Sequence, residues 1–373
     1  MPRSRLICSL LRASTRWCRP MPEPDGYKDW TGLAQAIKAA ATKAAGDGAS
    51  ALDVNAQIVQ AQHDRFLSRV FAEGEESEWL LKGGTAMLAR VPKSRSTKDL
   101  DLASTGAADL DAAQQALEQA AARDLGDHVR FQLTRARATG RGENQPGVAT
   151  RRLVFTCLDA NTGRRISDIP IDVVVGPPPV GRVETIEPST RLQLGRPVPS
   201  HPYRLFPISD QVAEKVTATM STYNGRPSSR AKDLVDIVTI ARTQRVDLRE
   251  LQMAIDAKRA LSKLDSFTTF TVPDGWDGPY RVLAAGTPSA GGITDLGEAV
   301  ALARQLIDPA LADAPVQPGT VWVPGSGWTQ NPPPPEPGGS GSPSGEVHVR
   351  AHVRSGYPAL RTFGGGHGVR ACT

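Results

Sequence analysis

The residues best placed to do chemistry are a double glycine and two carboxylates that follow it. Gly83 and Gly84 stand after a short apolar segment and before Thr85, which could cap a following helix. A glycine turn that opens a helix lets backbone amides approach a phosphate. Asp99 and Asp101 lie two residues apart in an alternating segment, so they would project from one face of a strand. The pattern indicates phosphate binding beside paired carboxylates.

Two like charges on one strand face are unfavourable unless a cation lies between them. Hard oxygen ligands favour Mg²⁺ or Mn²⁺ bound together with nucleotide phosphates. An isolated Asp-x-Asp pair would instead favour a solvated strand end, but the preceding double glycine favours a site. A third carboxylate, Asp172, interrupts an apolar strand, where an unpaired charge would be costly. Asp168 has the same strand parity and is its competitor. Three converging carboxylates would suit two-metal chemistry at phosphorus.

The hydrophobic periodicity predicts the elements that must position these residues. Apolar or alternating segments predict strands, and 3.6-residue periodicity predicts helices before and after them. The expected strands are 79–81, 98–103, 128–134, 152–158 and 169–175, and the expected helices are about 30–40, 53–72, 86–91, 107–123, 209–221, 229–243, 247–264 and 294–307. The predicted fold class is α+β: an N-terminal mixed sheet flanked by helices, then a mostly helical C-terminal lobe, with disordered termini.

The predicted domain boundaries follow shifts in composition. A basic N-terminal extension, 1–24, is either a real arm or a start-site artefact, because a second methionine, Met21, precedes the first helical sequence. The α/β domain is expected over 25–206 and the helical domain over 207–323. A tail rich in proline, glycine and serine is expected over 324–373.

The net charge of +5 at pH 7 comes from the ends of the chain. Residues 1–20 hold five arginines and no acidic residue, and the region between the ends is close to neutral. A generic basic nucleic-acid-binding protein is therefore excluded, and any RNA-binding surface must be a local patch. Four cysteines without a Cys-x-x-Cys pair support neither a disulfide scaffold nor a zinc site. This cysteine pattern fits a reducing cytoplasm, where we expect the protein to act. No apolar run could span a membrane, so we expect no membrane partner.

Lys82–Ala86 and Arg95–Asp101 resemble the signature of the AbiEii/AbiGii-type nucleotidyltransferase toxins, within the DNA polymerase β-like nucleotidyltransferase superfamily. Three later segments are similar to the remaining motifs of that family, in the expected order: Ile171–Val173, Glu214–Ala218 and Ser229–Asp236. The resemblance covers about residues 55–310. It implies that the 25–206 region is a nucleotidyltransferase-like domain.

The resemblance also implies a role for each matching residue. The catalytic set would be Asp99, Asp101, Asp172, Lys215 and Asp233, with the metal on the first three; the nucleotide-binding set would be Lys82, Gly83, Gly84, Thr85, Arg95, Thr97, Lys215 and Arg230. Taken alone, Lys215 would be a solvated helix lysine, and Arg230 with Asp233 a surface pair.

The activity that the resemblance implies is Mg²⁺- or Mn²⁺-dependent transfer of NMP from an NTP to an acceptor, expected to be a tRNA 3′ end. The protein would act as the toxin of a toxin–antitoxin or abortive-infection system, with a separately encoded antitoxin as partner. Two alternatives remain open: a small-molecule or protein hydroxyl as acceptor, or an inactive nucleotide- or antitoxin-binding remnant. A cluster of arginines is either an RNA-facing patch or a solvated strand edge: Arg130, Arg135, Arg137, Arg141, Arg151 and Arg152.

Overall fold

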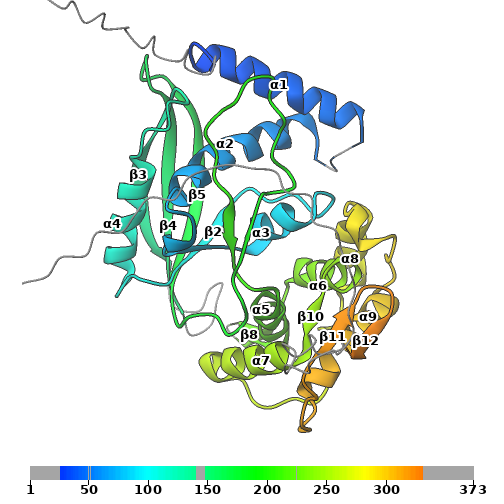
Figure 1. Cartoon of the computed structure of the whole chain (residues 1–373). Coiled ribbons are helices and arrows are strands. Elements are labelled where there is room, and N and C mark those ends of the chain that lie inside the picture. Colours follow the sequence, from blue (N-terminus) through cyan, green and yellow to red (C-terminus); the bar gives the residue numbers. More distant parts are fainter. Residues whose placement is uncertain (1–25, 49, 51, 140–147, 224, 331–373) are drawn as a thin grey trace, which may run out of the picture. The chain divides into compact units, whose positions relative to one another are not determined.

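The computed structural model describes residues 26–330 except 49, 51, 140–147 and 224 (Figure 1). The extension expected over 1–24, the part of the expected tail from 331 onward and Arg141 lie outside the described residues. Among the described helices, none is both long and apolar enough to cross a membrane.

A seven-stranded mixed sheet forms the first part of the described chain, in the order β3-β4-β5-β2-β1-β7-β6. β2 runs parallel to β5 and β1 parallel to β7, whereas the other neighbours are antiparallel. The strands are β1 (Trp79–Lys82), β2 (Leu100–Ser104), β3 (Val129–Thr139), β4 (Ala149–Asp159), β5 (Arg165–Val175), β6 (Glu184–Ile186) and β7 (Tyr203–Leu205).

One face of this sheet packs against helices. The helices of this part are α1 (Trp30–Gly46), α2 (Val54–Val70), α3 (Gly83–Arg90) and α4 (Leu110–Ala121), with a 3₁₀ turn, η1, at Gly74–Glu76. Aspartate side chains at positions 29, 53 and 109 cap the first turns of α1, α2 and α4. Alternate strand residues such as Leu102, Phe155 and Ile171 join Phe66 and Leu117 in one buried core. The other face of the sheet therefore carries the intervening, polar positions.

The second part of the chain is mostly helical and has its own core (Figure 1, green to orange). Its helices are α5 (Ile208–Met220), α6 (Ala231–Thr243), α7 (Leu248–Ser262), α8 (Asp277–Ala285) and α9 (Leu296–Leu311), with a 3₁₀ turn, η2, at Pro288–Ala290. Short strands join them: β8 (Thr222–Tyr223) pairs with β9 (Arg226–Pro227), and β10 (Val246–Asp247) forms a small sheet with β11 (Thr320–Val323) and β12 (Gly327–Gln330).

The structure confirms the predicted fold class and differs at particular boundaries. β2 begins at Leu100, so Asp99 precedes the strand that was expected to contain it. β12 lies beyond residue 323, where the tail was expected to begin, and its Trp328 packs edge-on against Trp322 at 5.7 Å between ring centroids. The short strands β6 and β7 were not predicted, because three residues give too little periodicity to detect.

Candidate active site

A single row of polar side chains crosses five strands of the sheet. The directly paired positions are Arg137 in β3, Arg152 in β4, Asp172 in β5, Asp101 in β2 and Lys82 in β1. Because directly paired residues point to the same side, all five lie on the face opposite the buried core. The sheet register thus brings together residues that lie up to 90 positions apart in sequence.

The turn between β1 and α3 lies against one member of this row. Gly83 has φ +62°, and a Cβ atom there would stand 1.9 Å from Oδ2 of Asp101. Only glycine allows both the left-handed backbone and this approach. Gln211 of α5 donates from Nε2 to the Gly83 carbonyl oxygen at 3.0 Å. The turn is therefore fixed from the helical part of the chain.

Asp99 is held by its backbone at the start of β2. Its carbonyl oxygen accepts hydrogen bonds from the hydroxyls of Thr85 (3.1 Å) and Thr97 (3.4 Å). Thr97 also packs on Gly84, where a Cβ atom would lie 3.0 Å from the Cβ of Thr97. The double glycine and the two threonines thus join the turn to the first acid.

The three acids differ in their partners. The Asp101 carboxylate makes no hydrogen bond or ion pair with another residue in the described part of the chain. Burial raises the pKa of Asp101, and the nearby charge of Asp99 adds to this, although lysines oppose it. Burial, with Asp101 and Asp99 adding to it, raises the pKa of Asp172 to about 6 despite the nearby Arg152. These carboxylates repel one another and lack sufficient counter-charge.

Arg152 bridges the two remaining acids. Its guanidinium lies 2.8 Å from Oδ1 of Asp99 and 3.3 Å from Oδ2 of Asp172. The arginine cluster predicted from the sequence therefore divides. Arg152 belongs with the acids, whereas the preceding Arg151 pairs with Asp111 of α4 at 2.7 Å on the other face.

The competitor Asp168 takes a different role. It points to the same face of the sheet but pairs with Arg135, Arg165 and Thr156, outside the polar row. Of the two acids, Asp172 is the one that lies beside Asp101 and lines the same cavity.

The residues that line the site have the oxygen donors that a hard divalent cation requires. Three carboxylates face one cavity, and Asp101 forms no ion pair with a described residue; such oxygen donors are the ligands that these ions prefer. Within the described residues, however, no three His, Cys, Asp or Glu side chains converge closely enough to form a ready-made metal cluster. Arg152 stands between two of the three acids.

The helical part contributes charges through α5 and α6. Lys215 is buried, and its Nζ lies 2.6 Å from Asp236 and 3.4 Å from Asp233. Burial opposes its charge, but the two acids outweigh burial and raise the pKa of Lys215, which stays protonated. Arg95 donates two hydrogen bonds of 2.8 Å to Asp236, and Arg230 donates from Nε to Asp233 at 2.5 Å.

These groups line one cavity of about 250 Å³, between the polar face of the sheet and α5 and α6. Its lining includes most of the residues predicted for the site: Gly83, Gly84, Arg95, Thr97, Asp99, Asp101, Asp172, Lys215, Arg230 and Asp233. Four further members were not predicted as site residues: Thr150, Arg152, Val174 and Lys232. Arg152 had been assigned to the arginine cluster, and Lys232 lies within a quoted motif but was given no role.

Two predicted nucleotide-binding residues do not line this cavity. Lys82 is buried, pairs with Glu214 at 2.7 Å and lines an adjoining cavity of about 100 Å³. Burial would raise the pKa of Glu214, but Lys82 and Lys258 outweigh it and lower the pKa to about 2. Thr85 lines a different cavity, which lies against α1, α2 and α3.

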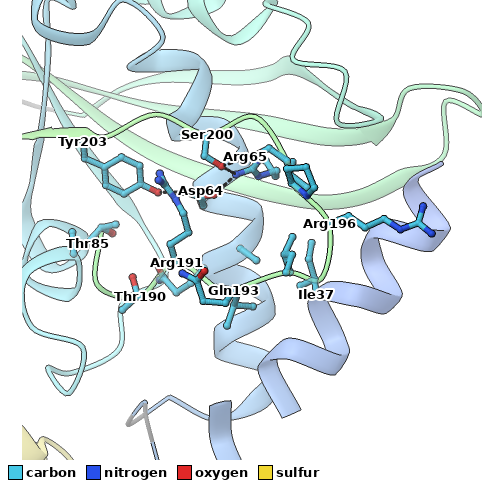
Figure 2. A pocket seen from close by; sticks show the side chains of 17 residues that line it. Ile37, Asp64, Arg65, Thr85, Thr190, Arg191, Gln193, Arg196, Ser200 and Tyr203 are labelled. Atoms are coloured by element: carbon cyan, nitrogen blue, oxygen red, sulfur yellow. Dashed lines mark hydrogen bonds and ion pairs between the residues drawn. The ribbon is translucent and has the colours of Figure 1, made fainter. Parts of the chain in front are cut away.

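Figure 2 shows this other cavity, of about 260 Å³, between α1, α2, α3 and the segment that joins β6 to β7. Its charged groups pair with one another. Asp64 accepts hydrogen bonds from the Tyr203 hydroxyl (2.6 Å) and from Arg191 Nε (2.9 Å), and it also contacts Arg65. The Asp64 carboxylate therefore has hydrogen-bonding partners, which the Asp101 carboxylate lacks among the described residues. These contacts hold the segment between β6 and β7 against α2.

A double-glycine turn beside an Asp-x-Asp pair, a third acid on the next strand and cations from a helical lobe define a nucleotidyltransferase. Residues 65–296 match the sequence model of the family described as "Nucleotidyl transferase AbiEii toxin, Type IV TA system". The chain belongs to this family of toxins from toxin–antitoxin systems, which implies an NTP substrate, usually a divalent metal, and a separate antitoxin.

The solved structures that are similar to this chain include two with named proteins. MenT4, a nucleotidyltransferase toxin from Mycobacterium tuberculosis, is 14% identical with a TM-score of 0.40, covering 74% of this chain and 97% of its own. JHP933 from Helicobacter pylori is 15% identical with a TM-score of 0.35, covering 68% and 93%. These TM-scores are too low to decide the fold, which rests on the family match and the sheet described above. No curated protein matches the sequence.

Proposed function

We propose that this toxin transfers NMP from an NTP to the 3′ end of a tRNA in the cytoplasm, with Mg²⁺ and release of pyrophosphate. The observation that carries the proposal is the Asp101 carboxylate, which makes no hydrogen bond or ion pair with any residue that the structure describes. It lies against the Gly83 turn and beside Asp172, in a cavity that also holds several cationic side chains. A negatively charged substrate and a divalent cation would together balance these charges.

The chain's own residues would bind and orient the triphosphate. The backbone amides at the start of α3, from Gly83 onward, are available donors for phosphate oxygens. Arg230 and Lys232 face the same cavity and would neutralise charge on the phosphates. Arg95 and Lys215 are held by Asp236, which fixes their positions.

The metal would be held by Asp99, Asp101 and Asp172, and when bound it would supply positive charge at the α-phosphate and the departing pyrophosphate. The acceptor hydroxyl attacks the α-phosphorus, and the bond from that phosphorus to the pyrophosphate oxygen breaks. Asp172 lines the cavity and would receive the hydroxyl proton on its carboxylate.

The open face of the sheet supports an RNA acceptor. Arg130, Arg135 and Arg137 pair in register with Leu158, Val154 and Arg152, so all three point to the face that carries the catalytic row. All three are exposed. A polyanionic acceptor could therefore contact these arginines while its end enters the cavity.

Incubating the purified protein with total RNA, Mg²⁺ and each labelled NTP in turn tests the proposal. Label on a discrete tRNA band is expected with the wild type and is expected to be lost with Asp101→Asn. No label on any RNA would count against an RNA acceptor and would favour a small-molecule or protein hydroxyl instead.

A second arm tests the RNA surface. Arg135→Glu with Arg137→Glu is expected to abolish RNA labelling, whereas Arg151→Glu, on the opposite face, is the matched control. Labelling that survives the double charge reversal would count against RNA contact on this face.

Growth of cells that express the toxin tests the biological role. Arrest is expected with the wild type, relief with Asp101→Asn, and neutralisation by the separately encoded antitoxin. If Asp101→Asn arrests growth as strongly as the wild type, the inactive-remnant alternative is favoured.

A further inference from the structure

Arg152 lies in a position that no motif of the family resemblance assigned. It stands in β4, directly paired with Asp172 of β5 and Arg137 of β3. Its side chain is about one-third exposed, and it contacts two acids from two different strands, Asp99 and Asp172. It is the one basic residue in the described ranges that bridges members of the acid triad.

The guanidinium and a divalent cation need the same oxygen atoms. The Asp99 carboxylate at 2.8 Å and the Asp172 carboxylate at 3.3 Å are the groups that the proposed metal requires, and the charge-assisted contacts of Arg152 use them. Asp101, the third acid, makes no hydrogen bond or ion pair with Arg152 or with any other described residue, and it meets the charge of Arg152 only at longer range. The guanidinium of Arg152 therefore already occupies the place between Asp99 and Asp172 that the proposed metal would need.

We propose that Arg152 is a built-in competitor of the catalytic metal: its guanidinium holds Asp99 and Asp172 together and leaves them when the divalent ion binds. This proposal rests on the proposed metal-dependent function. Once it has left the acids, the guanidinium remains in the lining of a cavity that is suited to phosphates. Binding of the metal and binding of the triphosphate then favour each other, because one frees the cation that the other attracts.

Calorimetric titration with MnCl₂ alone tests the competition without any need for activity. Arg152→Gln removes the competing charge and is expected to bind Mn²⁺ about tenfold more tightly than the wild type, the equivalent of one charge-assisted hydrogen bond. Arg152→Lys keeps the charge but cannot bridge two carboxylates through a planar fork, so an intermediate affinity is expected. Arg151→Gln loses the same charge from the opposite face and is expected to match the wild type.

The side-chain Nε–H resonance of Arg152 gives a direct readout. The signal is assigned by its absence from the spectrum of Arg152→Gln, and it is expected to shift on addition of MgCl₂ to the wild-type protein. The corresponding signal of Arg151 is expected to stay in place.

Equal or weaker Mn²⁺ binding by Arg152→Gln would overturn the proposal, because Arg152 would then only preorganise the acids. If Arg152→Gln binds Mn²⁺ more tightly but the wild-type protein transfers no nucleotide, the proposed function is overturned and the competition between Arg152 and the metal still holds. If neither the wild type nor Arg152→Gln binds Mn²⁺, both the competition and the proposed metal-dependent function are overturned.

Discussion

At the scale of the residue, the acidic charges of the site lower the stability of the fold rather than raise it. Asp101 is the clearest case: loss of solvation and the nearby Asp99 raise its pKa although three lysines oppose this, and its half-buried carboxylate makes no hydrogen bond or ion pair with a described residue. A charge that is removed from water without a hydrogen-bonding partner costs free energy of folding. Such a residue is expected where function, not stability, selects the side chain.

Asp101→Asn is therefore expected to raise the melting temperature in EDTA while lowering transfer at least a hundredfold, since the amide removes charge repulsion. Differential scanning fluorimetry and the labelling assay measure the two effects. Asp265→Asn, at an exposed position, is the control and should change neither. A lower melting temperature for Asp101→Asn would mean that its charge is balanced within the protein.

His63 gives a prediction about pH. It is only 2% exposed, and burial lowers its pKa to about 4. Above pH 6.5 the folded and unfolded states are both neutral at this residue; as the pH falls, the unfolded chain binds a proton first, so stability is lost between pH 6.5 and about 4. His63→Leu is expected to remove about 2 kcal/mol of the stability lost between pH 7.5 and pH 5. Urea titrations at both pH values measure this; parallel losses in the two proteins would contradict it.

The identity of most site residues could be predicted from the sequence, but their partners could not. Asp99, Asp101 and Asp172 stand out because acids interrupt strand patterns. Arg152 and Asp236 do not stand out, because an arginine in an exposed strand and an acid in a helix are common. Their roles depend on the register of β4 and on the packing of α6.

At the scale of the element, the turn between β1 and α3 is the most constrained part of the site. Gly83 has a left-handed backbone and no room for a Cβ atom, whereas the neighbouring Gly84 is helical and meets only the side chain of Thr97. This turn was predictable as a glycine-rich helix start. The steric reason for Gly83 was not, because Asp101 reaches it only through the pairing of β1 with β2.

Gly83→Ala is expected to destabilise the protein by more than about 2 kcal/mol, from the left-handed backbone and from displacement of the Asp101 carboxylate. It is also expected to abolish transfer. Gly84→Ala is the matched control, with a change in stability of about 1 kcal/mol or less, because Thr97 can shift and alanine favours the helix. Urea denaturation and the labelling assay distinguish the two variants; equal effects would mean that the carboxylate moves aside easily.

At the scale of the whole molecule, the sheet and the helical part share contacts that also build the site. Arg95 pairs with Asp236 of α6, Lys82 pairs with Glu214 of α5, and Gln211 fixes the Gly83 turn. The order of a mixed sheet followed by helices was predictable from periodicity. These joining contacts were not, since they link residues more than 120 positions apart.

The end of the helical part gives a prediction about domain limits. Trp322 of β11 is buried and donates from Nε1 to the Ala241 carbonyl at 2.7 Å. A chain ending at Pro318 is expected to be less stable by about 3 kcal/mol or more than one ending at Gln330, because it loses this side chain. Thermal unfolding of the two truncated proteins measures the difference. Equal melting temperatures would show that the small sheet adds nothing to the core.

The polar row that crosses β3, β4, β5, β2 and β1 runs along the hydrogen-bonding direction, so the spacing of its members is set by the distance between neighbouring strands. Insertions in the connecting loops would lengthen the gaps between motifs without moving a single catalytic atom. A one-residue insertion inside β2 or β5 would turn an acid toward the hydrophobic core. In enzymes built in this way, the number of residues between motifs can change widely during evolution, while the face of the sheet to which each strand residue points stays the same.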